Sequence, residues 1–162
     1  MPTSKLPAAV AVFLAIAPST AYAEKLDPTR AFSLTHSPIH LLLSTMEVTG
    51  EFCLGRKHGV AAIGALGVPL GVVVVELGGS YRLYALGDFD RGMQLGGEFL
   101  WSGGTNGYES VSLTQYSLMA GGKFTFDFGL TMEGQVGPSW LDGDLGPMIN
   151  LNIGWSFGEK RW

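Results

Sequence analysis

Apolar and polar residues alternate with a period of two along most of the chain. In residues 149–157, five apolar side chains fall on one face, and two Asn, a Gly and a Ser fall on the other. Such alternation is typical of a β-strand, because successive side chains point to opposite faces. The pattern predicts strands over residues 46–54, 75–85, 93–101, 118–128, 130–140 and 149–157.

Two weaker segments bring the predicted number of strands to eight. Residues 32–43 alternate near their end, at Ile39, Leu41 and Leu43, but Pro38 interrupts them, and strands tolerate proline only at an edge, a start or a bulge. Residues 60–66 are small and apolar throughout, so their two faces cannot be distinguished. Turn-forming residues separate the segments, and no segment shows a helical stripe.

A transmembrane helix is the alternative for residues 59–75, which contain 17 residues and no charge. The glycines of this segment, Pro69 and the β-branched run at 72–75 favour a hairpin that turns at Pro69. A hairpin is therefore the prediction.

Residues 1–23 have the pattern of a secretory signal peptide. Lys5 precedes an apolar run at residues 7–17, and Ala21-Tyr22-Ala23 is an A-x-A cleavage site. The alternative is a membrane anchor, but the run is too short to span a bilayer as a helix. We expect export, with residues 24–162 as the mature domain.

The composition of the two strand faces indicates which face lines the barrel interior and which lies on the outside. The chain is 46% hydrophobic and 15% charged, its net charge is −4, and its ten Lys and Arg residues are scattered, which argues against nucleic acid as a partner. The polar faces carry small residues with one or two charges, whereas the apolar faces carry large and aromatic residues. Such faces suit a polar lumen and a lipid-facing exterior. The predicted fold is all-β: an eight-stranded antiparallel up-and-down transmembrane β-barrel.

Four stretches, residues 38–43, 47–52, 123–133 and 150–157, resemble a family of small, functionally uncharacterised Gram-negative outer-membrane β-barrel proteins. The resemblance implies localisation in the outer membrane, contact with outer-membrane lipid, and insertion by the barrel-assembly machinery, which reads a terminal aromatic residue. Phe157 or Trp162 would supply that residue. We expect a monomer. The resemblance implies no catalytic, cofactor-binding or metal-binding residues.

The alternation places five acidic and two basic side chains inside the predicted barrel. They are Glu47, Glu51, Glu76, Glu98 and Glu133, with Arg82 and Lys123. We expect a packing network, because buried charges must be paired to offset their desolvation. The predicted function is therefore structural. A narrow, porin-like path that favours cations is the other reading, since three carboxylates are in excess.

Two further functional classes stay open. An outer-membrane hydrolase acting on lipid or peptide would use His36, Ser37, His40 or His58, but the sequence shows no acid partner for them, and two histidines alone make a weak metal site. We therefore predict no catalytic residue, cofactor or metal. A soluble periplasmic barrel of lipocalin shape would need the apolar faces inside.

A glycine-rich segment and a single cysteine complete the pattern. Residues 102–110 are rich in glycine and are expected to form the one sizeable loop, with a flexible tip. Cys53, the only cysteine, is expected to face the lumen as a small packing residue.

Overall fold

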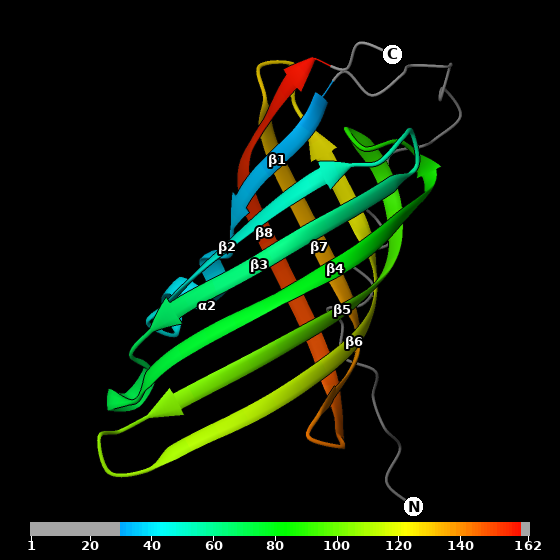
Figure 1. Ribbon diagram of the computed structural model, residues 1–162. Helices are drawn as coiled ribbons and strands as arrows, with labels where there is room; N and C mark the ends of the chain where they lie inside the picture. The colour runs from blue at the N-terminus through cyan, green and yellow to red at the C-terminus, as the bar shows by residue number, and fades with distance from the viewer. Residues whose placement is uncertain (1–29, 160–162) are drawn as a thin grey trace, which may run out of the picture.

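Eight strands close into one antiparallel barrel (Figure 1). The structure is a computed structural model that describes residues 30–159, so the predicted signal peptide and Trp162 lie outside the described residues. Each strand pairs with its neighbours in the chain, and β1 pairs with β8 to close the sheet. The strands are β1 (Arg30–His36), β2 (Thr45–Cys53), β3 (His58–Gly67), β4 (Val73–Gly87), β5 (Arg91–Thr105), β6 (Ser110–Thr125), β7 (Leu130–Leu141) and β8 (Asp144–Glu159). The predicted antiparallel eight-stranded barrel is confirmed.

Residues 59–75 form a hairpin, as predicted, and not a helix. β3 and β4 pair from His58↔Leu83 to Gly67↔Val74, and the 3₁₀ turn η2 (Pro69–Gly71) joins them. Proline fits here because the turn needs no donor from its backbone nitrogen. No helix within residues 30–159 is long and apolar enough to cross a membrane.

The prediction of one strand over residues 32–43 is wrong in its second half. β1 ends at His36, and Pro38 begins the short helix α2 (Pro38–Leu42), which contains Ile39 and Leu41. Proline is favoured in the first turn of a helix, where its missing N–H would have no partner. Ser44 then takes a positive φ of 60° and leads into β2. The alternation of three apolar residues was therefore too short to distinguish a strand from a helical turn.

The predicted loop at residues 102–110 is also wrong, because most of it belongs to strands. Gly103 and Gly104 pair with β4 and β6, and only residues 106–109 form the connection. The Asn106 side chain accepts hydrogen bonds from the backbone N–H groups of Tyr108 and Glu109, which closes a tight turn. The strand predicted over residues 118–128 ends earlier than expected. β6 ends at Thr125, because residues 126–129 form the turn into β7.

The barrel is polar inside and apolar outside. Within residues 30–159, 22 of the buried residues are polar or charged and only 8 are hydrophobic. Every strand exposes large apolar side chains, among them Leu34, Phe52, Val60, Tyr81, Trp101, Tyr116, Met132 and Trp155. This is the reverse of the distribution in ordinary soluble domains, which bury their large apolar residues.

Candidate functional site

Four charged residues meet in the lumen, and we call them the ion-pair network: Glu51, Arg82, Lys123 and Glu133. Arg82 Nη1 lies 3.1 Å from Glu51 Oε2 and 2.7 Å from Glu133 Oε1. Lys123 Nζ lies 2.7 Å from Glu51 Oε2. All four side chains are almost completely buried, so each charge is compensated by a partner inside the barrel.

The strand register positions this network. Lys123 and Glu133 lie directly opposite each other on β6 and β7, and Arg82 on β4 lies opposite Gly59 on β3. A methyl group at Gly59 would overlap Glu51 Oε1, so the glycine leaves room for the carboxylate. Tyr84 donates a hydrogen bond of 2.7 Å from its hydroxyl to the same oxygen.

The turn between β4 and β5 closes the lumen beside the network. Phe89 in this turn is completely buried and packs edge-to-face on Tyr84, with ring centroids 5.8 Å apart. The Lys123 ammonium lies 3.5 Å from the centroid of the Phe89 ring, which is a cation–π contact. Cys53 joins Tyr84 and Phe89 in a small buried cluster, so it lies inside the barrel. Tyr84 and Phe89 thus form an aromatic plug, which covers the ion-pair network at the end of the lumen beside the β4–β5 turn.

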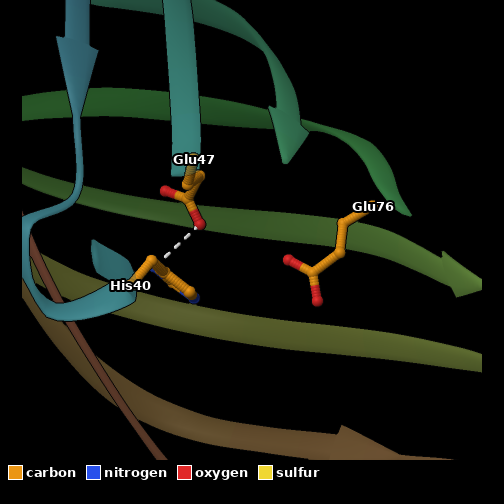
Figure 2. A group of neighbouring side chains, drawn as sticks. All are labelled: His40, Glu47 and Glu76. Carbon is orange, nitrogen blue, oxygen red and sulfur yellow. Dashed lines mark ion pairs between the residues drawn. The ribbon is translucent and has the colours of Figure 1, made fainter. Parts of the chain in front are cut away.

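A second group of titratable residues lies at the other end of the lumen, and we call it the His40 cluster: His40, Glu47 and Glu76. His40 comes from α2, Glu47 from β2 and Glu76 from β4. Figure 2 shows the three side chains converging, with an ion pair of 3.1 Å between His40 Nδ1 and Glu47 Oε2. One potential ligand atom from each residue lies within 4.8 Å of those from the other two.

The two glutamates of the His40 cluster converge because a small residue separates them. Glu47 pairs with Ala65 on β3, and Ala65 pairs with Glu76 on β4, so the three form one inward-facing row across the sheet. Ala65 contributes only a methyl group between the two longer side chains. Ser102 continues the row on β5 and donates a hydrogen bond of 3.1 Å to Glu76 Oε1.

Several polar atoms near the His40 cluster lack a hydrogen-bond partner among residues 30–159. They include Glu47 Oε1, His40 Nδ1 and Glu98 Oε2. His40 Nδ1 is close enough to Glu47 for an ion pair, but its alignment does not give a hydrogen bond. Buried polar groups in native proteins are usually satisfied, so this end of the lumen is suited to a further partner such as water or an ion.

The seven residues predicted for the lumen all lie on inward-facing positions, but they fall into separate groups. Glu51, Arg82, Lys123 and Glu133 form the ion-pair network, whereas Glu47 and Glu76 meet His40 at the other end. Glu98 is buried on β5. Sequence reasoning missed Phe89, Tyr84, Ser102 and the role of His40, because their positions depend on turns and on the register between distant strands.

The hydrolase candidates are not brought together. His58 begins β3 at the opposite end from His40, and its Nδ1 lies 2.6 Å from the hydroxyl of Tyr81. The Ser37 hydroxyl is buried and makes no hydrogen bond to the part of the chain that the structure describes. His40 has an acidic neighbour in Glu47, which the sequence alone did not reveal, yet it has no hydroxyl nucleophile hydrogen-bonded to it within residues 30–159.

Comparisons with protein-family models, curated proteins and solved structures gave no match to this chain.

Proposed function

We propose that this chain is an outer-membrane β-barrel with a structural role, whose lumen is closed by the ion-pair network and the aromatic plug. The observation that carries the proposal is the distribution of side chains, with large apolar residues exposed on every strand and polar or charged residues inside. In water, such a surface would favour association with other apolar surfaces. In a bilayer, it would lie in hydrocarbon, and a closed sheet leaves no unpaired edge.

The arrangement of the chain supports an orientation. β1 begins and β8 ends at the same end of the barrel, and α2 lies at the opposite end (Figure 1). Outer-membrane barrels with an even number of strands keep both termini on the periplasmic side. We therefore place the aromatic plug on the periplasmic side and the His40 cluster toward the cell exterior. Export would follow from the signal peptide expected at residues 1–23.

The closed lumen supports a structural role over a wide channel. The interior of an eight-stranded barrel is only wide enough for side chains to fill. Here Glu51 on β2 reaches Lys123 on β6, the strand directly across the barrel, and Arg82 on β4 reaches Glu133 on β7. Polar side chains therefore cross the lumen from wall to wall.

The same distribution argues against a soluble barrel of lipocalin shape, which would need an apolar cavity. The exposed leucines offer a direct test of whether the outer surface faces lipid or water. Leu118 lies near the middle of β6, whereas Leu70 lies in η2, and both are exposed. In a bilayer, Leu118→Arg would cost about 2–4 kcal/mol, while a charge near the interface costs far less.

The experiment compares Leu118→Arg with Leu70→Arg in a Gram-negative host. We expect the wild type and Leu70→Arg to be found in the outer-membrane fraction with heat-modifiable migration on gels, and Leu118→Arg to be reduced there. Release of the wild type with the soluble periplasmic fraction, or equal behaviour of the two variants, would overturn the proposal.

A further inference from the structure

The lumen contains more carboxylates than its lysine and arginine can pair. Both basic residues of the predicted lumen set, Arg82 and Lys123, contact Glu51 or Glu133. Among residues 30–159, no lysine or arginine forms an ion pair with Glu47, Glu76 or Glu98. A buried carboxylate must be paired, protonated or compensated by a cation, so a bound cation is one way to satisfy the glutamates at this end of the lumen.

The orientation of Glu47 points to where a cation would lie. Its side chain is only 3% exposed, and its carboxylate points toward His40 (Figure 2). One oxygen faces the imidazole at 3.1 Å, and the other has no hydrogen-bond partner within the described chain. Glu98 on β5 adds a second buried carboxylate oxygen without a hydrogen-bond partner there.

We propose that His40, Glu47 and Glu76 bind a divalent transition-metal ion, with Zn²⁺ as the best-suited ion. Imidazole nitrogen and carboxylate oxygen are both ligand types that Zn²⁺ accepts, and with three protein ligands a water molecule can take the fourth position. Alkaline-earth ions prefer oxygen ligands alone, so the imidazole favours a transition metal.

The geometry requires only a small adjustment. Ligand atoms of a tetrahedral zinc site lie roughly 3.3 Å apart at the usual zinc–ligand distances of about 2.0 Å. His40 and Glu47 already meet this separation, and Glu76, which is half-buried, needs to approach them by side-chain rotation. Its hydrogen bond from Ser102 holds one carboxylate oxygen and leaves the other for the metal.

The site lies close to one end of the barrel. The side chain of His40 is 30% exposed, and α2 lies at the end of the barrel opposite the aromatic plug (Figure 1). The proposal depends on the barrel interior and not on membrane insertion. Its failure would therefore leave the proposed outer-membrane function untouched.

The test is a Zn²⁺ titration of the full chain, produced in a Gram-negative host and purified in detergent, against a chromophoric chelator. We expect one Zn²⁺ per chain, at least tenfold weaker binding in His40→Gln and Glu76→Gln, and unchanged binding in His58→Gln. His58→Gln is the matched control because it removes a histidine outside the cluster. Circular dichroism and heat-modifiable migration establish that each variant folds.

Two results would overturn the proposal: no Zn²⁺ bound by the folded wild type, or the same affinity in His40→Gln as in His58→Gln. Ser102→Ala supplies a second measurement if Glu76→Gln fails to fold. Because it removes only the hydrogen bond to Glu76, it should weaken Zn²⁺ binding severalfold, and unchanged affinity would contradict the assigned role of Glu76.

Discussion

The carboxylate of Glu51 and the ammonium of Lys123 lie 2.7 Å apart inside the barrel, although 72 residues separate them in the chain. β2 and β6, which carry them, are four strands apart in a closed barrel of eight, so the pair spans the lumen. Arg82 shares the same carboxylate oxygen. Glu51 therefore joins both buried cations, and the ion-pair network depends on it more than on any other residue.

Glu51→Gln should destabilise the barrel strongly. The substitution leaves Lys123 with no ion-pair partner among residues 30–159 and leaves Arg82 with Glu133 alone. Breaking a buried ion pair costs about 3–5 kcal/mol. Urea unfolding followed by circular dichroism measures the change. Glu109→Gln is the control, because Glu109 is exposed in the connection between β5 and β6. Equal stability of the two variants would contradict the role of the network.

Gly59→Ala should lower the free energy of unfolding by about 1–3 kcal/mol, the usual effect of overpacking. The added methyl group would displace the Glu51 carboxylate from its position. Gly64→Ala on the same strand should have little effect, because no heavy atom lies within 4 Å of a methyl group there. The two variants are compared by the midpoint of urea unfolding. A shift for Gly64→Ala as large as that for Gly59→Ala would show that Gly59 is not needed to make room for the Glu51 carboxylate.

Tyr84→Phe should cost about 1–3 kcal/mol, because it removes the hydroxyl that satisfies a buried carboxylate oxygen. Tyr108→Phe removes a hydroxyl from an exposed ring, so we expect no measurable change in stability. Thermal unfolding of both variants in the same detergent tests this difference. If Tyr84→Phe were as stable as the wild type, the hydroxyl would not support Glu51.

The wild type should show no large stable conductance in planar bilayers, since the network and the Phe89 ring fill the lumen. Arg82→Ala removes the side chain that joins β4 to β7 across the lumen, so we expect more frequent small conductance events in this variant. A large conductance in the wild type would contradict the closed lumen.

Much of the fold could be predicted because alternation reports the two different surroundings of each strand. Val73 to Gly87 is a clear case, where large apolar and polar or small residues alternate over most of β4. The helical turn at Pro38 could not be predicted, since five residues carry too little periodicity. Glycine and serine at residues 102–110 predict a loop because they suit turns, whereas pairing with β4 and β6 decides the conformation of residues 102–105.

Less of the candidate site could be predicted. Alternation indicates that Glu47 and Glu76 face inward, but only the register through Ala65 places them in one row. His40 joins them because α2 turns it toward β2, whereas the alternation of residues 32–43 predicts a strand there. Phe89 lies between the strands predicted at residues 75–85 and 93–101, and nothing local distinguishes an exposed turn residue from one that folds into the lumen.

Fluorescence quenching by lipids with brominated acyl chains tests the central claim most directly. Trp101 and Trp155 are both exposed on the outer surface of the barrel. After reconstitution of the protein in such lipids, we predict strong quenching of the tryptophan emission, because these rings would lie against the acyl chains. Emission that is unchanged by bromination would show that the apolar surface does not face lipid and would contradict the proposal that the chain is a transmembrane barrel.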